Sequence, residues 1–324
     1  MKIQTEYNAI DIRQWRELVA ASPVATWFQT PEAYCFFASL PGMMMPFSFA
    51  VENGGELKGV VVGYVTREKN PIKQFFTRRA IVYGGPLLAE NISDEELKCL
   101  LFSLCSMLKN KAIYIETRNF CDYSRWRAVF EQYGFVYQPH YDIHIYSGDK
   151  EQMISRISES RLRQIRRAEA EGFEVKEAAT TEEIKSFYML LKSLYKTKVH
   201  TPLFPLDFFT TFVQQKRGVL LLVIQQEKIV GGILCPILDN RVLYEWFIVG
   251  PVVVTWAAMK YANIHNIPLF DLMGAGKPDE HYGVRDFKMR FGGRQVEYGR
   301  FLMICNKTLY KIGQVGVRML KTGK

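Results

Sequence analysis

The chain has 324 residues, of which 48% are hydrophobic and 23% are charged. This composition excludes a mini-protein, a disordered chain, a collagen-like fibre and a coiled coil, and the length predicts two domains of about 100–200 residues each. The net charge of +9 favours polyanionic partners such as phosphates, nucleic acid or an anionic membrane surface, without choosing among them.

The compartment is predicted from the cysteines and from the apolar segments. Six scattered cysteines form no Cys-x-x-Cys pair, so we expect free thiols in a reducing compartment. Residues 1–6 contain no apolar run of the kind found in secretory signals, which predicts a cytoplasmic protein. The longest apolar stretch, 246–259, is shorter than the roughly 20 residues that span a bilayer.

In the first half, the pattern predicts two helices, a β-hairpin, a strand that stops at Gly-Pro, a third helix and two further strands. The helices are expected at 12–19, at 34–40 and before residue 112, and the strands at 47–52, 57–65, 80–83, 112–116 and 133–144.

The second half repeats this order, including a Thr-Pro pair after the first helix and a strand that stops at Gly-Pro. The strands are expected at 219–225, 229–238, 242–249, 268–272 and 291–304. Ser147-Gly148-Asp149-Lys150 has the composition of a linker, so we predict two domains, 1–148 and 149–324. Strand pairs interleaved with helices predict an α/β fold in each domain, with helices on both faces of a mixed (α+β) sheet.

Three segments carry distinctive motifs. They are HYGVRDFKMRFGG at 281–293, RLRQIRRAEAEG at 161–172 and FQTP at 28–31. These motifs and the order of elements resemble the FemAB family, whose relatives are built from two tandem GNAT-like acyltransferase domains. The resemblance covers nearly the whole chain in the order of its elements, and it is most specific in the segment 281–293.

The resemblance implies that the reaction centre lies in the second domain at Phe287 and Lys288. A positioned ammonium could stabilise the oxyanion of a tetrahedral intermediate or hold a phosphate. Glu245 interrupts an apolar strand at which GNAT enzymes often carry a general base, and Asp271 lies in a segment similar to the family's F-D-F-x-G. The alternatives are a solvated helix lysine for Lys288, an outward-facing Glu245, and a structural cap for Asp271.

Substrate binding is predicted for an arginine-rich helix and for residues near the reaction centre. Arg163, Arg166 and Arg167 share one helix face through their i,i+3 and i,i+4 spacing and could grip phosphates. The alternative is a solvated face paired with Glu169 and Glu171. The remaining candidates flank the predicted centre: Tyr244, Trp246, Tyr282 and Arg285.

The acyl donor is predicted from the loops that follow the Gly-Pro strands. An ordinary GNAT domain binds the coenzyme A pyrophosphate there through consecutive backbone N–H groups. Pro251 removes one donor, the valines 252–254 hinder close approach, and Gly85-Pro86 raises the same objection in the first half. We therefore expect no bound cofactor, and a donor that is aminoacyl-tRNA or, less favoured, acyl-CoA.

Two further features invite an interpretation. His140, Asp142 and His144 alternate along a strand, but the outer two lie roughly 13 Å apart at about 3.3 Å per residue, so we expect no metal site. The tail 306–324 carries five cations and no acids, and could lie on an anionic membrane at the inner face. The alternative is that this tail docks against the second domain.

The resemblance to the FemAB family implies an enzyme that moves an acyl or aminoacyl group to an amine of a cell-envelope precursor, in peptidoglycan or polysaccharide synthesis. One alternative is a coenzyme A-dependent GNAT N-acyltransferase. The other is a noncatalytic tRNA- or envelope-binding module that has kept the fold. The acceptor, the acyl group and the oligomeric state stay open. We also expect Lys288→Ala to reduce turnover without lowering the melting temperature.

Overall fold

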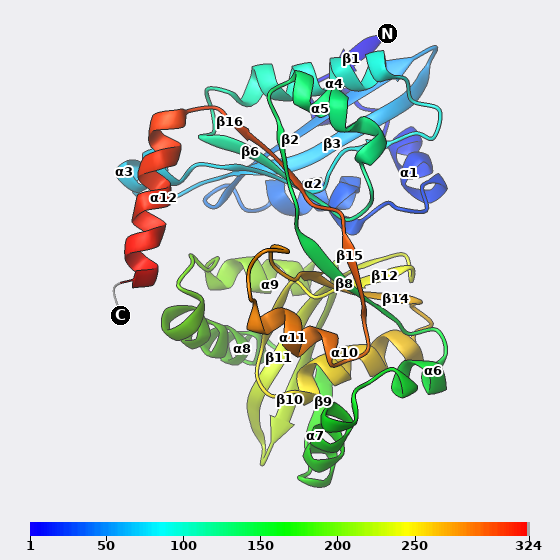
Figure 1. Cartoon of the computed structure of the whole chain (residues 1–324), viewed down its shortest axis with the longest axis vertical. Helices are drawn as coiled ribbons and strands as arrows, with labels where there is room; N and C mark the ends of the chain where they lie inside the picture. Colours follow the sequence, from blue (N-terminus) through cyan, green and yellow to red (C-terminus); the bar gives the residue numbers. More distant parts are fainter. Residues whose placement is uncertain (323–324) are drawn as a thin grey trace. The chain divides into compact units, whose positions relative to one another are not determined.

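A computed structural model describes residues 1–322 of the chain, with side chains as far as Val315. The chain forms two compact units (Figure 1). Unit 1 comprises Met1–Pro139 and Tyr298–Lys324, and unit 2 comprises His140–Glu297. Each unit contains one mixed sheet with helices packed on it, which confirms the predicted fold class.

The sheet of unit 1 has the strand order β1-β2-β3-β4-β6-β16-β7, and β5 pairs with β3. Only β4 and β6 run parallel; the other pairs are antiparallel. The strands are β1 (Lys2–Gln4), β2 (Met44–Asn53), β3 (Glu56–Thr66), β4 (Ala80–Gly84), β5 (Leu87–Leu88), β6 (Tyr114–Asn119), β7 (Val136–Gln138) and β16 (Arg300–Ile304).

Helices cover both faces of this sheet. They are α1 (Ile12–Ala21), α2 (Pro31–Ala38), α3 (Pro71–Thr77), α4 (Asp94–Leu108), α5 (Arg127–Gln132) and α12 (Lys307–Thr322). Local sequence sets their starts: Ser93 and Glu96 form a capping box at α4, and Thr30 caps α2 ahead of a proline. Helices α4 and α5 pack with one face of the strands into a core, whereas α1 contacts β3 and α2 contacts β2 and β3.

The sheet of unit 2 has the order β15-β8-β14-β12-β11-β10-β9, and β13 pairs with β11. Here β12 and β14 are the parallel pair. The strands are β8 (Tyr141–Tyr146), β9 (Glu174–Glu177), β10 (Gly218–Gln225), β11 (Lys228–Leu238), β12 (Val242–Tyr244), β13 (Phe247–Val249), β14 (Leu269–Gly274) and β15 (Arg294–Glu297).

The helices of unit 2 also lie on two sides of its sheet. They are α6 (Lys150–Ser155), α7 (Glu159–Ala170), α8 (Thr181–Leu194), α9 (Leu206–Gln214), α10 (Val253–Ile264) and α11 (Gly283–Met289). Helix α10 packs on β10 and β11 within the main core, together with residues of α6 and α7. Helices α8 and α9 contact the same strands and carry a separate group of buried phenylalanines, which includes Phe187, Phe208 and Phe212.

The last strand predicted for each half is in fact two strands that belong to different sheets. The stretch 133–144 forms β7 in unit 1 and β8 in unit 2, and 291–304 forms β15 in unit 2 and β16 in unit 1. Pro139 separates the first pair and Gly299, at φ 63°, separates the second. The units therefore differ from the expected division after residue 148, because β8 precedes that point and β16 returns to unit 1.

The C-terminal tail also belongs to unit 1, where α12 lies against α3. This differs from the alternative in which the tail docks against the second domain. The side chains of 316–324, including Arg318, Lys321 and Lys324, lie outside the described residues. Among the described residues, no helix has the length and apolar character that crossing a bilayer requires.

The returning strand β16 predicts a measurable contribution to the stability of unit 1. Phe301 is fully buried and stacks on Phe130 at a ring distance of 4.1 Å. Truncation to Phe301→Ala should lower the free energy of unfolding by about 3–5 kcal/mol, since it leaves a cavity in a packed core. Urea denaturation measures this change. Ile304→Ala, at the exposed end of the same strand, is the control and should cost under about 1 kcal/mol; equal losses would refute the role given to β16.

Candidate active site

The site begins where the parallel strands β12 and β14 separate. Strand β12 pairs with β14 only over Val242–Tyr244, and after a break at Glu245 and Trp246 the chain continues as β13, which pairs with β11. The predicted strand 242–249 is therefore interrupted. The break places the Glu245 carboxylate inside the unit, beside the end of β14, where it is buried.

Lys288 projects from α11 into this break and is only 7% exposed. Its Nζ lies 3.0 Å from Glu245 Oε1 and donates to the carbonyl oxygens of Leu272, Gly274 (3.3 Å) and Met273 (3.5 Å). An ammonium has three hydrogens, so these four acceptors use all of its donors. Lys288 thus ties α11 to the end of β14, and it is not a solvated helix lysine.

Asp271 and two residues of β8 complete the cluster. Asp271 Oδ1 accepts the Met273 N–H at 2.6 Å, and Oδ2 lies 3.5 Å from His144 Nε2. The Asp142 carboxyl shares a hydrogen bond with Asp271 and also accepts the Ile143 N–H. All three polar side chains are buried. Sequence analysis missed Asp142 and His144 as partners of Asp271, because it placed their strand in the first domain.

The cluster contains more acid than base. Three buried carboxyls surround one lysine, and two charged carboxylates in contact would repel each other strongly in a low-dielectric interior. Burial and the neighbouring Asp271 raise the pKa of Asp142 well above its ordinary value. Burial also raises the pKa of Glu245, against the opposing charge of Lys288. Burial and the neighbouring Asp271 thus both favour the neutral form of Asp142, which can donate a hydrogen bond to Asp271.

The backbone at the end of β14 is strained. Met273 adopts φ 55°, a left-handed conformation that side chains other than glycine rarely take. The β14–β8 pairing shifts register between Asp271 and Gly274, so Met273 lies within a bulge. Strained backbone persists only where surrounding contacts enforce it, and it concentrates at functional sites. Here the enforcing contacts are those of Asp271 and Lys288.

The arginines of α7 fall into an exposed group and one buried residue. Arg163, Arg166 and Arg167 are exposed; Arg167 pairs with Glu171 at 2.8 Å and Arg163 lies 4.0 Å from Glu159. Arg161 was not singled out from the sequence, yet it is buried, with its guanidinium 4.3 Å from the ring centre of Phe287.

The contacts of Arg161 explain why Phe287 accompanies Lys288. The guanidinium also lies 4.5 Å from the ring centre of Phe291 and donates to the Phe287 carbonyl at 3.2 Å. Arg161 therefore holds α11 through Phe287, which serves as its stacking surface. The sequence does contain a signal for this role. Arg161 lies one turn before the apolar Ile165, so the two residues share the buried face of the helix.

The other predicted substrate contacts have structural partners. Tyr244 is buried, and the ring of Trp246 packs on Phe208 at 5.0 Å. Arg285 donates to the carbonyl oxygens of Lys277 (2.7 Å) and Glu280 (2.5 Å), which closes the loop before α11. Tyr282 is exposed and packs over Gly276. Among these four, Tyr282 presents the most surface to a ligand.

Unit 1 carries different chemistry in the corresponding elements. Helix α5 matches α11 in the repeat, but Phe130 replaces the lysine and stacks on Phe301. In β6, Glu116 accepts from Arg118 and from Arg300, both at 3.0 Å. Although burial favours the neutral acid, these two arginines lower the pKa of Glu116 to about 2. The lysine–carboxylate cluster is therefore specific to unit 2.

The two Gly-Pro loops are packed rather than open. In unit 2, Gly250 lies against β11, where a Cβ would stand 2.6 Å from Gly231 Cα. In unit 1, Gln29 Nε2 donates to the carbonyls of Gly84 (3.1 Å) and Gly85 (3.0 Å), and the Tyr123 hydroxyl covers Gly85. The Phe28–Pro31 motif thus has a structural role, since Gln29 holds this loop.

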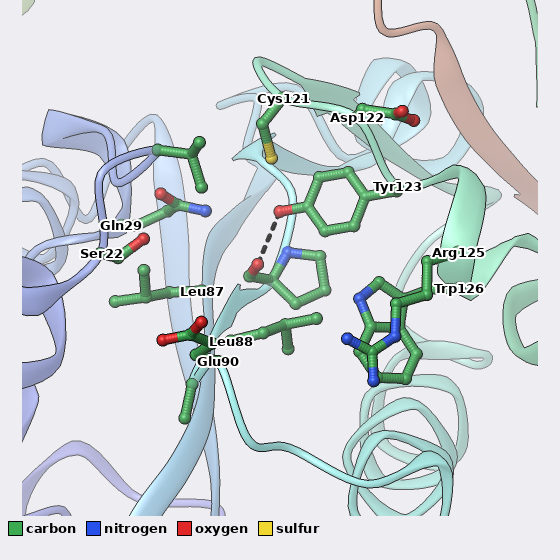
Figure 2. Close-up of a pocket in the computed structure, with 13 residues that line it drawn as sticks. Ser22, Gln29, Leu87, Leu88, Glu90, Cys121, Asp122, Tyr123, Arg125 and Trp126 are labelled. Carbon is green, nitrogen blue, oxygen red and sulfur yellow. Dashed lines mark hydrogen bonds between the residues drawn. The ribbon is translucent and has the colours of Figure 1, made fainter.

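A small cavity of about 200 Å³ lies beside the unit 1 loop. Figure 2 shows Tyr123 in the lining of this cavity. Its hydroxyl donates to the carbonyl oxygen of Pro86 at 2.6 Å. Leucine side chains form one part of the lining, and Trp126 with Arg125 stacked on it at 4.4 Å forms another. Gln29 and Tyr123 bind the loop carbonyls and so hold the loop in place, and Pro86 has no N–H to offer a pyrophosphate.

The raised pKa of Asp142 predicts a pH dependence. A carboxyl with a raised pKa in the folded state stabilises the fold below its ordinary pKa of 3.8, and this stability is lost as the pH rises toward the raised value. Asp142→Asn retains a donor for Asp271 and an acceptor for Ile143 but cannot ionise. As the pH rises through that window, the free energy of unfolding of the wild type should therefore fall more steeply than that of the variant. The difference between the two slopes should be about 1.4 kcal/mol per pH unit.

Urea denaturation between pH 5 and 8 measures this difference. Asp279→Asn, a change at an exposed aspartate of the same unit, is the matched control and should follow the wild-type curve. If Asp142→Asn and the wild type lose stability in parallel, the carboxyl does not hold a proton in the folded state.

The segment that carries the cluster resembles a known family. Residues 244–316, which include Glu245, Asp271 and Lys288, match the sequence profile of the FemAB family. No sequence among the curated proteins is significantly similar to the chain.

Solved structures share the fold of the whole chain. The structure of FemX is 16% identical, with a TM-score of 0.71, over 96% of this chain and 99% of that chain. A tandem GNAT protein from the clavulanic acid biosynthesis pathway is 10% identical, with a TM-score of 0.57, over 94% and 98%. L-PGS from Bacillus licheniformis is 11% identical, with a TM-score of 0.55, over 87% and 91%. Residues 244–316 thus match the FemAB family, and the chain as a whole shares the fold of tandem GNAT proteins.

Proposed function

We propose that the protein transfers an aminoacyl group from aminoacyl-tRNA to an amine of a cell-envelope precursor, in peptidoglycan or polysaccharide synthesis. The observation that carries the proposal is the buried Lys288 cluster at the break between β12 and β14, inside the segment that matches the FemAB family. The resemblance to that family implies this donor and this class of acceptor.

In the proposed reaction, the acceptor amine attacks the carbonyl carbon of the ester that links the amino acid to the tRNA. A C–N bond forms, the C–O bond to the tRNA breaks, and the released ribose hydroxyl takes up a proton. The amine loses a proton, which Glu245 or Asp271 accepts. The raised pKa of Glu245 suits a proton acceptor that works near neutral pH.

Lys288 has two roles in this proposal. At rest it positions the strained end of β14. In the reaction an oxyanion reaches Nζ by displacing its longest partner, the Met273 carbonyl at 3.5 Å. The attraction between the ammonium and the oxyanion then replaces the attraction between the ammonium and the carbonyl dipole. The interaction at Nζ therefore strengthens as the oxyanion forms.

Two features favour tRNA over coenzyme A as donor. Pro251 has no N–H and Gly250 is packed against β11, so the loop before α10 offers fewer backbone donors and less room for a pyrophosphate. The exposed Arg163, Arg166 and Arg167 offer a surface for a nucleic-acid backbone. The fold shared with other tandem GNAT proteins keeps a coenzyme A-dependent N-acyltransferase as the second candidate.

The first test measures aminoacyl transfer to an amine acceptor by the purified protein, with aminoacyl-tRNA or acyl-CoA as donor. Lys288→Ala should reduce turnover from aminoacyl-tRNA by at least about tenfold, equivalent to 1.4 kcal/mol of barrier. Unlike the expectation from sequence, it should also lower the melting temperature, because Glu245 loses its buried partner. Turnover is therefore compared at a temperature at which circular dichroism shows both proteins folded.

Arg290→Ala is the control, because Arg290 is an exposed cation two residues further along the chain. It should keep wild-type turnover. Full activity in folded Lys288→Ala would refute the site, whereas transfer from acyl-CoA alone would replace the proposed donor with the second candidate.

The second test concerns the arginine surface of α7. Replacement of Arg163, Arg166 and Arg167 by Gln should weaken tRNA binding and reduce the slope of log K against log salt by about two or more, since roughly 0.7–0.9 is lost per phosphate contact. Filter binding over a range of salt concentrations measures this. Lys185→Gln with Lys192→Gln, both exposed on α8, is the control. An unchanged slope in the arginine variant would mean that α7 only faces water.

A further inference from the structure

Helix α3 exposes apolar side chains that its own unit does not cover. Ile72, Phe75 and Phe76 are between 40% and 72% exposed. Their i, i+3, i+4 spacing puts them on one side of the helix. The helix connects β3 to β4 and buries none of its residues, so packing within unit 1 does not explain this composition.

The adjacent helix extends the apolar surface. In unit 1, α12 lies against α3 (Figure 1). Leu309 is buried at the start of α12, whereas Ile312 and Val315, at successive steps of three residues, are about half exposed. We call the exposed side chains of Ile72, Phe75, Phe76, Ile312 and Val315 the α3–α12 face.

Cations surround this face. The segment 67–79 exposes three, Arg67, Lys69 and Lys73, and contains one acid. That acid, Glu68, pairs with Lys73 at 3.0 Å. Residues 307–315 of α12 add Lys307 and Lys311 and no acid. An apolar surface with a strongly basic border is complementary to a membrane that carries anionic headgroups above an apolar interior.

We propose that the α3–α12 face binds an anionic phospholipid bilayer. Ile72, Phe76 and Ile312 enter the boundary between headgroups and acyl chains, and the lysines contact the phosphates. The helices lie in the plane of the interface, as expected for amphipathic segments that do not span the bilayer. This proposal is independent of the reaction proposed above, because it concerns only unit 1.

A nucleic acid fits this face less well. Base stacking needs an open aromatic face. The Phe75 ring is covered by the Arg78 guanidinium at 5.4 Å and meets the Phe76 ring edge-on at 5.1 Å. The other members of the face are aliphatic, and aliphatic groups gain more from acyl chains than from bases.

The experiment is co-sedimentation of the full chain with vesicles of phosphatidylcholine alone or mixed with phosphatidylglycerol. The wild type should bind the mixed vesicles at least about tenfold more tightly. Ile72→Ser with Phe76→Ser should abolish most of this binding. Lys69→Gln with Lys311→Gln should weaken it by about fivefold per cation removed and make it less sensitive to salt.

The matched control is Phe102→Ser with Ile264→Ser, which removes two apolar side chains from other helices that are at least as exposed as Phe76 and Ile72. It should bind like the wild type, and all variants are checked for unchanged melting temperature. The proposal is overturned if the control loses as much binding as the α3 variant, or if phosphatidylglycerol makes no difference. It is also overturned if the α3 variant keeps vesicle binding but loses tRNA binding, which would make this face a nucleic-acid surface.

Discussion

The burial of one ammonium group sets the geometry of the candidate site in unit 2. Removing Lys288 Nζ from water costs several kcal/mol unless charge and hydrogen bonds compensate, and here one carboxylate and three carbonyl oxygens do so. Those acceptors converge through three features: the strand break at Glu245, the bulge at Met273 and the position of α11. A strained β14 end therefore follows from the position of the lysine.

The elements of the fold could be predicted from the sequence, but the sheets to which the last strands belong could not. Alternation of apolar residues identifies a strand, and it is the same whichever sheet the strand joins. Only Pro139 and Gly299 mark the two points at which the chain changes sheet, and single prolines and glycines also occur within ordinary turns. The domain boundary was expected after residue 148 because Ser147–Lys150 has the stronger linker composition.

The same limit explains which site residues were found. Lys288, Glu245 and Asp271 all lie in the second half of the chain, so motif and burial arguments bring them together. Asp142 precedes the expected boundary, and only the pairing of β8 with β14 brings it to Asp271. Arg161 was hidden for another reason: a basic run indicates a solvated helix, and the sequence does not reveal that Phe287 and Phe291 enclose one of its members.

The arrangement of the cluster depends on energetic coupling between Lys288 and Glu245. A double-mutant cycle measures this coupling directly. The free energy of unfolding at pH 7 is determined for Lys288→Ala, Glu245→Ala and the double variant. Each single change should cost about 3–5 kcal/mol, because it leaves the other charge buried without a partner. The double variant should cost less than the sum of the two single changes by at least about 1.5 kcal/mol. Additive losses would mean that the two groups do not stabilise each other, and would contradict the central claim.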